Sequence, residues 1–387
     1  MIIPEKPYIS EFLTKSAEIF EIPILKTHAL LEHDLSKYNL KLLNEQEAVD
    51  YLSQNENVLL YSNSESSFDW INSNLKKSPV VGFINLFKNK VKFREILKSV
   101  YPDFFFKKLS YNELLNVDIT ALPEEFVIKP AVGFLSLGVH AVYNKLQWQE
   151  TLKKIQSEIH ILDTEYSDIV VNSSDFIVEE MINGEEFAVD AYFNKNGKPI
   201  VLNIFHHPFK DENDVSDRIY LTSSQIIKDN LSEVQDILSR IGNQVNLKNF
   251  PMHIEFRKRN DGLIIPIEVN PMRFAGWCTT DVAKYAYDMN VYEYYFKQKE
   301  PNWEKIFDKN DNSIYYFSMA EVPSCIDKRY IKSFDYECFC ENYSNILELR
   351  KVDFSCNPLF AVIFGKTDNQ KEIFNILNLK TADYIEL

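Results

Sequence analysis

Glycine is scarce in this sequence. The 387 residues include nine glycines, whereas average usage of about 7% would give about 27. Glycine is the residue best suited to left-handed backbone and to close approach between segments. We therefore expect most of the nine to stand where the backbone requires them, at positions 82, 133, 138, 184, 197, 242, 262, 276 and 365.

Long hydrophobic runs are absent as well. No apolar run approaches the ~18–20 residues that a membrane-spanning helix needs. Residues 1–7 lack the basic start and the apolar stretch of a secretory signal peptide. We therefore predict a cytoplasmic protein without a membrane partner.

Cysteine usage fits that prediction. The five cysteines, an odd number, stand at positions 278, 325, 338, 340 and 356. Only one residue separates Cys338 from Cys340, which is the wrong spacing for a redox or zinc pair. We expect buried, reduced thiols, as in proteins of a reducing compartment.

The charge balance is acidic, with 42 basic and 57 acidic residues and a net charge of -15. This balance argues against duplex DNA or an anionic membrane as the main partner, and we predict no nucleic-acid partner. A small anionic ligand in a local basic pocket stays compatible with it. Hydrophobic residues at 45% and charged residues at 26% are ordinary for a soluble globular protein of two to three domains.

The pattern of apolar residues alternates between helix-like and strand-like segments. In the first part of the chain we predict short strands at 57–61 and 79–84, followed by a helix over 89–101 that Pro102 closes. A strand-rich block covers 126–143 and a helix covers about 145–160. Two hairpins with a helix near 225–241 between them fill 176–270, and a last helix lies near 369–377.

The first segment with chemical content runs from Phe126 to Val139. An apolar strand ends at Lys129, and a loop follows with Gly133, Ser136 and Gly138 before a second apolar strand. Such loops can fold backbone N–H groups over phosphate oxygens, with the lysine as a fixed positive charge. It is neither a Walker A loop nor a Rossmann fingerprint, because no helix follows it. The alternative is a plain glycine-bearing hairpin.

The second segment runs from Phe176 to Asp190. A short apolar strand leads into Glu179 and Glu180, then Met181 and Ile182, then a turn at Gly184. On the strand that follows, Glu186 and Asp190 share one face. The alternative for the two adjacent glutamates is a solvated acidic turn.

The third segment is a hairpin from Met252 to Pro271, with Asp261-Gly262 as its turn. A two-residue loop places Glu255 opposite Glu268 and His253 opposite Asn270, all on one face. Two carboxylates with Cβ atoms about 5 Å apart repel by roughly 3 kcal/mol at an effective dielectric constant near 20.

A cation or a shared proton would relieve that repulsion. Two carboxylates and an amide oxygen are hard ligands that suit Mg²⁺ together with phosphate oxygens. The alternative is a three-residue loop, which shifts the register by one and turns the two acids to opposite faces unless a bulge restores them.

These three segments, in this order, resemble the ATP-grasp superfamily, which includes biotin carboxylase, D-alanine–D-alanine ligase and carbamoyl-phosphate synthetase. The resemblance covers about residues 88–277. It implies an α/β (α+β) fold with four parts. They are an N-terminal α/β domain (1–88), a helix with a small lid subdomain (89–183), an antiparallel-sheet subdomain for nucleotide and metal (184–300) and a C-terminal extension packed on the core (301–387).

The resemblance also implies roles for individual residues. Lys90 and Lys129 resemble the phosphate-binding lysines, and 133–138 the glycine loop over ATP. Glu179 resembles the adenine-side acid, with backbone of Glu180 and Ile182 at the base edge and Met181 and Ile182 in the apolar wall. The ribose acid would be Glu186, and the Mg²⁺ ligands, with Mn²⁺ as an alternative metal, would be Glu255, Glu268 and Asn270.

One spacing departs from the family. Arg273 stands one residue farther along than in the family's Asn-x-Arg, because the run is Asn270-Pro271-Met272-Arg273. We interpret Arg273, with Lys129, as catalytic, contacting the transferred phosphoryl group or a substrate carboxylate. For His206, His207 and Arg218 we expect ordinary structural or surface roles.

The implied reaction is ATP-dependent ligation. The lysines and Mg²⁺ neutralise the phosphates, a substrate carboxylate takes the γ-phosphoryl group, and an amine captures the acyl phosphate to give an amide, ADP and phosphate. The substrates would be a small carboxylate and an amine, such as an amino acid or a peptide, acted on by a monomer or homodimer. The alternatives are a kinase-like phosphotransferase and a non-catalytic ATP-binding regulatory module.

Overall fold

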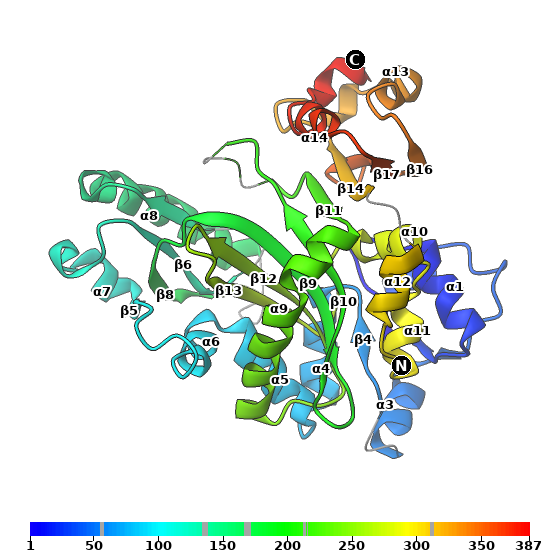
Figure 1. The fold of residues 1–387 in the computed structure, drawn as a ribbon, viewed down its shortest axis with the longest axis horizontal. Coiled ribbons are helices and arrows are strands. Elements are labelled where there is room, and N and C mark those ends of the chain that lie inside the picture. Colours follow the sequence, from blue (N-terminus) through cyan, green and yellow to red (C-terminus); the bar gives the residue numbers. More distant parts are fainter. Residues whose placement is uncertain (55–57, 134–137, 166–171, 212–213, 215, 310–312) are drawn as a thin grey trace.

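The computed structural model describes residues 1–387 apart from 55–57, 134–137, 166–171, 212–213, 215 and 310–312. Figure 1 shows a large central sheet, with the N-terminal elements on one side and a small sheet with its helices on the other. The C-terminal elements gather at one end of the central sheet. Helices and strands both contribute substantially, so the α/β prediction is confirmed.

The N-terminal part is a four-stranded parallel sheet in the order β3-β2-β1-β4. Its elements are β1 Ile2–Ile3, α1 Glu11–Ile19, β2 Ile24–Leu25, α2 His28–Leu31, β3 Leu42–Leu43, α3 Glu45–Gln54, β4 Tyr61–Ser62, η1 Glu65–Ser67 and α4 Phe68–Asn74. The strand predicted at 57–61 is shorter and later, since residue 57 lies outside the described residues and β4 begins at Tyr61.

The strand predicted at 79–84 is wrong, because this segment is the helix α5, Pro79–Lys88. The Ser78 side chain accepts a hydrogen bond from Val80 N–H, and Pro79 occupies the first turn, where its missing N–H costs nothing. Asn89 ends α5 and caps α6, Lys90–Leu97, which stops before the predicted end at 101. This junction holds Lys88 and Lys90 on either side of a cap.

A small antiparallel sheet follows, in the order β5-β8-β6-β7, with its own hydrophobic core. Its elements are β5 Phe106–Ser110, α7 Tyr111–Leu115, η2 Ile119–Ala121, β6 Phe126–Val132, β7 His140–Val142, η3 Lys145–Gln147, α8 Trp148–Glu165 and β8 Asn172–Glu180. The predicted strand block and the helix after it are confirmed.

The central sheet has eight antiparallel strands in the order β13-β12-β9-β10-β11-β14-β17-β16. Its first strands and helix are β9 Gly184–Phe193, β10 Pro199–His207, β11 Ile219–Thr222, α9 Ser224–Val245, β12 Phe250–Arg259 and β13 Ile264–Pro271. Helix α9 packs on this sheet so closely that a Cβ at Gly242 would lie 2.2 Å from the Phe193 ring. The predicted helix and the β12–β13 hairpin are confirmed, whereas the first hairpin is β9–β10, because the start of the predicted range belongs to β8 of the small sheet.

The segment after β13 is helical. It contains η4 Thr279–Asp281, α10 Val282–Tyr287, α11 Val291–Phe296 and α12 Trp303–Lys309. Tyr292 and Tyr295 of α11 are buried in the main core.

The C-terminal residues add strands to the central sheet. These elements are β14 Ile314–Glu321, η5 Lys328–Tyr330, β15 Ser333–Phe334, α13 Tyr336–Cys340, β16 Ile346–Lys351, β17 Leu359–Thr367, α14 Gln370–Leu377, η6 Thr381–Tyr384 and β18 Ile385–Glu386. Strand β14 pairs with β11, so this extension is continuous with the sheet. Arg218 was expected at the surface. Its Nη1 donates to the carbonyls of Leu377 and Leu379, and these hydrogen bonds hold the end of α14 against the central sheet.

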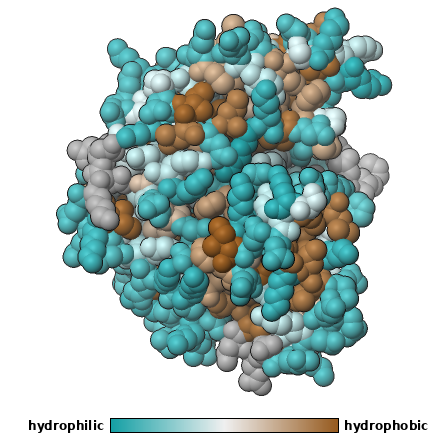
Figure 2. Space-filling model, turned by 90° about the vertical axis from the view of Figure 1, so that its right-hand side faces the viewer, coloured by the Kyte–Doolittle hydropathy of each residue, from teal (hydrophilic) through white to brown (hydrophobic). Residues whose placement is uncertain are grey.

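The last features of the fold are the distribution of hydrophobic side chains on the surface and the exposure of the thiols. Figure 2 shows hydrophobic side chains in separate areas of one face, among more numerous hydrophilic ones. Within the described ranges, no helix is long and apolar enough to cross a membrane. The expectation of buried thiols holds for Cys278 but is wrong for Cys325, Cys338 and Cys356, which are exposed because they lie in turns or on the open face of α13.

Candidate functional site

The β12–β13 hairpin carries the predicted metal residues, but its loop differs from the prediction. Arg259 N–H donates to Leu263 C=O, and Gly262 N–H donates to Arg259 C=O, both at 2.9 Å, so the loop holds the three residues 260–262. Gly262 has a φ of 91°, whereas Asp261 lies outside the left-handed region. The predicted two-residue loop is therefore wrong.

A β-bulge restores the predicted register at the site. The pairing shifts by one residue directly after Glu255, which leaves Ile267 as the extra residue on β13. Glu255 lies opposite Glu268, and His253 lies opposite Asn270. The cross-strand pairs are thus confirmed, although the bulge produces them and the loop does not.

The pKa values of the two paired carboxyl groups are shifted in opposite directions. Burial and the nearby Glu268, Glu186 and Asp217 raise the pKa of Glu255 well above its ordinary value. Burial alone would raise the pKa of Glu268 too, but three lysines outweigh it and lower that pKa. Asn270 Nδ2 donates to Glu255 Oε1 at 3.0 Å. Ionising both acids would bring two negative charges together, and a divalent cation would relieve that repulsion.

Lys90 and Lys129 converge on this site from different elements. Lys90, the first residue of α6, places Nζ 2.9 Å from Glu268 Oε1 and donates to the Gly133 carbonyl at 3.3 Å. Lys129, on β6, pairs with Glu179 at 2.8 Å. Both lysines are at least nine-tenths buried, so their charges are poorly screened by water.

Glu179 is held between two cations. Its carboxylate accepts from Arg94 Nε and pairs with Lys129, and these two cations outweigh the effect of burial and lower the pKa of Glu179 to about 2. Arg94, only 2% exposed, also donates to the Pro266 carbonyl at 2.7 Å and stacks over Phe104. Sequence reasoning missed Arg94, although it shares the apolar face of α6 with Val91 and Leu97.

The backbone beside Glu179 is already hydrogen-bonded. Glu180 N–H donates to the Phe105 carbonyl, and Met181 N–H donates to the Glu125 carbonyl. The Ile182 carbonyl accepts from Arg257 Nη1 at 3.3 Å. Ile182 is buried, whereas Met181 is half-buried.

Glu186 lies in a row of charged and aromatic side chains across three strands. Arg257 of β12 donates to Glu186 Oε2 from both Nε and Nη2 at 3.0 Å, and His207 Nδ1 lies 3.2 Å from Oε1. The His207 ring stacks on Tyr220 with centroids 4.2 Å apart. His206 packs against Phe187. Arg257 and His207 are the cross-strand neighbours of Glu186, a signal that sequence reasoning did not use.

Asp190 of β9 connects β12, which carries the predicted metal ligand Glu255, to the segment after β13. It accepts from Ala275 N–H at 2.7 Å through Oδ1, which also lies 2.8 Å from His253 Nδ1. Met272, the extra residue in the Asn-Pro-Met-Arg run, has a φ of 65° and so turns the chain directly before Arg273. Arg273 Nη1 then donates to the Phe274 carbonyl at 3.1 Å.

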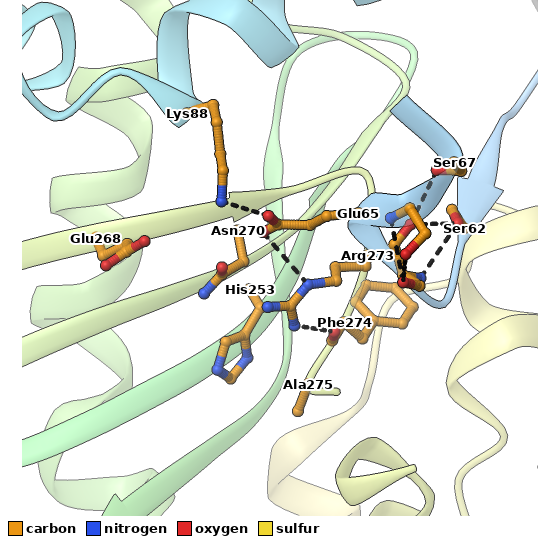
Figure 3. Close-up of polar contacts among 12 residues, drawn as sticks. Ser62, Glu65, Ser67, Lys88, His253, Glu268, Asn270, Arg273, Phe274 and Ala275 are labelled. Carbon is orange, nitrogen blue, oxygen red and sulfur yellow. Dashed lines mark hydrogen bonds and ion pairs between the residues drawn. The ribbon is translucent and has the colours of Figure 1, made fainter. Parts of the chain in front are cut away.

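A further charged cluster was not predicted. Lys88, at the end of α5, pairs with Glu65 of η1, and Arg273 Nε lies 3.8 Å from Glu65 Oε1. Figure 3 shows Glu65 between Lys88 and Arg273, with Glu268 on the far side of Lys88 and Asn270 below the Lys88 ammonium group. The error in predicting a strand at 79–84 hid Lys88, since it left this residue outside any element.

The structure describes only part of the glycine loop 133–138. Gly133 and Gly138 are described, and Gly138 has a φ of 71°. Ser136 and its neighbours 134–137 lie outside the described residues.

The donor set suits a magnesium–nucleotide site rather than a closed metal centre. In the part of the chain that the structure describes, no group of three or more His, Cys, Asp or Glu side chains could hold a metal ion. Two carboxylates and an amide leave the other coordination positions to phosphate oxygens and water, as Mg²⁺ commonly requires.

The comparisons with known proteins agree with this geometry. The family model of the ATP-grasp domain matches residues 122–281. No curated protein sequence matches the chain.

Solved structures match along the whole chain. An L-amino acid ligase from Bacillus licheniformis is 15% identical, covers 99% of this chain and 97% of its own, and has a TM-score of 0.65. Biotin carboxylase from Campylobacter jejuni is 11% identical, with coverages of 100% and 91% and a TM-score of 0.68. N5-carboxyaminoimidazole ribonucleotide synthetase from Thermotoga maritima is 10% identical. The match covers 100% of this chain and 98% of the synthetase, with a TM-score of 0.63. The chain therefore contains an ATP-grasp domain, within a fold that it shares with these proteins over its full length.

Proposed function

We propose that this protein is an ADP-forming ligase that joins a carboxylate to an amine with Mg-ATP. The observation that carries the proposal is the Glu255–Glu268 pair, tied by Lys90 to the start of α6. A pair of opposed acids beside a buried lysine suits a metal-bound polyphosphate and has no evident structural purpose. The L-amino acid ligase, with the same fold, supports the reaction type.

The nucleotide would lie between the small sheet and the central sheet. In this proposal Lys90 and Lys129 contact the phosphates, and the loop with Gly133, Ser136 and Gly138 closes over them. Glu179, Glu180, Met181 and Ile182 would border the adenine, and Glu186 the ribose. Because Glu179 is neutralised by Arg94 and Lys129, its proposed contribution is to fix Lys129 in place.

The metal would be held by Glu255, Glu268 and Asn270, with Mg²⁺ as the first choice and Mn²⁺ as an alternative. When bound, such a cation supplies charge neutralisation at the β- and γ-phosphates. The acid pair fits this purpose because the lysines around Glu268 favour its ionised form and because Glu255 forms no ion pair with any residue that the structure describes.

The chemistry then follows from the charges. A substrate carboxylate oxygen attacks the γ-phosphorus and ADP leaves, with Lys129 and Arg273 stabilising the charge on the transferred group. A neutral amine attacks the acyl carbon, phosphate leaves, and the amine proton passes to solvent or phosphate. We further propose that the enzyme works in the cytoplasm as a monomer or homodimer.

The test is ADP release screened across amino acids and small carboxylates, alone and in pairs with amines. We expect release that requires both a carboxylate and an amine. Release with a carboxylate alone and accumulation of a stable phosphorylated product would favour a phosphotransferase. Tight ATP binding without any release would favour a regulatory module.

A further inference from the structure

Glu65, Lys88 and Arg273 form a charged cluster, and of these three only Arg273 has a role in the reaction proposed above, at the transferred phosphoryl group. The side chains of the cluster come from η1, from the end of α5 and from the segment after β13 (Figure 3). Glu65 is 8% exposed and Lys88 is 4% exposed. Charged groups from three parts of the sequence therefore meet beside Glu255 and Glu268, on the side of these two acids that faces the N-terminal sheet.

One oxygen of Glu65 lacks a donor. Oε2 pairs with Lys88, but the buried Oε1 makes no hydrogen bond to any residue that the structure describes. Arg273 Nε is 3.8 Å from it, which is too far for a hydrogen bond. A buried carboxylate oxygen without a donor is costly, so this position favours a group that brings an N–H.

Arg273 has a hydrogen-bond donor that is not used. Its Nη1 donates to the Phe274 carbonyl, whereas Nη2 has no hydrogen-bond partner within the described ranges. The side chain is 17% exposed, so it is open to a small molecule. An unused acceptor and an unused donor therefore lie a few ångströms apart, as an ammonium next to a carboxylate would require.

The position of the cluster next to Glu255 and Glu268 indicates how a bound substrate would be oriented. Lys88 faces Glu65 on one side and Glu268 on the other (Figure 3). A short zwitterion could direct its carboxylate toward Lys88, Arg273 and the metal acids while its ammonium meets Glu65. Its reactive end would then lie beside the lysines that contact the γ-phosphate.

We propose that Glu65 binds the ammonium group of the carboxylate substrate, so that the acid this protein activates is an α-amino acid. The inference rests on the proposed ligase function and names the substrate class for it. An ammonium held by Glu65 has no lone pair and cannot attack the acyl phosphate. The attacking amine therefore comes from the second substrate.

The test compares amino acids with analogues that lack the amino group. ADP release is measured at saturating Mg-ATP and a fixed amine with L-alanine and propionate, L-phenylalanine and 3-phenylpropionate, and L-glutamate and glutarate. We expect the wild type to prefer the amino acid in kcat/KM. In Glu65→Gln this preference should fall about tenfold or more, because one charge-assisted hydrogen bond is lost.

Asp69→Asn is the matched control, since it makes the same acid-to-amide change at an exposed position four residues along. It should leave the preference unchanged. If Glu65→Gln does not fold because Lys88 loses the carboxylate of Glu65, the double variant Glu65→Gln with Lys88→Met removes both buried charges and is measured in its place. An unchanged preference in the folded variant overturns the inference while the ligase function stands.

Failure of the ligase function is distinguishable from failure of this site. If no carboxylate promotes ADP release in the wild type, calorimetric titration of the same amino acids decides the inference alone. Binding that the wild type shows and Glu65→Gln loses supports the ammonium site. Absent binding, or equal binding to both proteins, overturns it.

Discussion

Paired ionisable side chains define this site at the scale of single residues. Lys90 with Glu268, Lys129 with Glu179 and Lys88 with Glu65 are all largely buried pairs. Breaking such a pair leaves an uncompensated charge, which is costly in a poorly hydrated setting. In the proposed function a nucleotide phosphate takes over one partner of Lys90 and one partner of Lys129, and this exchange ties ligand binding to these two ion pairs.

Glu268→Gln tests the metal acid. The amide keeps the volume but loses the charge that Mg²⁺ requires, so we expect turnover to fall at least ~100-fold. The fold should persist, because the amide still accepts from Lys90. ADP release and circular dichroism measure the two expectations.

The matched control for that variant is Glu304→Gln, at an exposed position on α12. It should keep full activity. Full activity in Glu268→Gln itself would remove the metal assignment and the mechanism with it.

Glu179 makes the stability dependent on pH. Its pKa in the folded protein is about 2, below the ordinary 4.5, so it contributes stability fully above about pH 4.5 and loses it as the pH falls toward 2. The shift corresponds to about 3 kcal/mol at neutral pH. Glu179→Gln should therefore unfold more easily than the wild type at pH 7, by about that amount.

Urea unfolding at pH 7 and at pH 3 checks this prediction. The difference between the two proteins should shrink at the lower pH, because protonation removes the charge from the wild type as well. The exposed Glu337→Gln serves as the control. A difference that is independent of pH would show that Glu179 acts through packing and not through its charge.

The sequence was more informative about acids and lysines in motifs than about their partners. The pairing of Glu255 with Glu268 was predicted correctly but from a wrong loop length, and Lys90 was assigned to the site only through the family resemblance. Arg94 and Lys88 could not be predicted, since a charged residue on an apolar helix face acquires a partner only from other elements, here Glu179 and Glu65.

At the scale of elements, local turn chemistry decided where prediction succeeded. The Asp261-Gly262 pair correctly marked a hairpin, but both two-residue and three-residue loops use such residues. The bulge at Ile267, which sets the final register, has no marker in the residue pattern. In the 79–84 segment Ser78-Pro79 was the helix start, and the apolar run after it looked like a strand because both structures can be buried.

The glycine hairpin yields an element-scale prediction. A nonhydrolysable ATP analogue should slow amide hydrogen exchange at residues 129–133 and 138–142, because β6 and β7 would close on the phosphates. Lys129→Ala should lose most ATP affinity and with it the slowing. The distant strand β16 serves as an internal control.

Unchanged exchange at saturating analogue would count against a phosphate loop between Gly133 and Gly138. Slowing that persists in Lys129→Ala would instead assign the contact to the backbone of the hairpin alone.

The whole molecule is unified by its central sheet. Strands β14, β17 and β16 continue the sheet that carries the metal pair, and Arg350 of β16 pairs with the buried Asp281 at 2.6 Å. The extension of 301–387 was expected to pack on the core, but strand pairing over such a sequence distance leaves no local signal. The near-continuous apolar runs in 314–321 and 359–367 form buried strands that the sequence analysis did not predict.

Truncation tests this continuity. A chain ending at residue 309 would expose the edge of β11 and the apolar side chains that β14 covers, such as Ile219 and Leu221. We expect such a chain to aggregate, because open apolar edges pair with other chains. Size-exclusion chromatography measures this, and a monomeric, thermally stable fragment would show that the extension is an independent unit.

The most direct test of the ligase assignment follows an oxygen atom. Substrate carboxylates labelled with ¹⁸O are incubated with Mg-ATP, an amine and the enzyme, and the released phosphate is analysed by mass spectrometry. If the carboxylate attacks the γ-phosphorus and the amine then displaces phosphate, each phosphate carries one ¹⁸O atom from the substrate. Phosphate without label, at measurable ADP release, would contradict the acyl-phosphate route and the ligase function built on it.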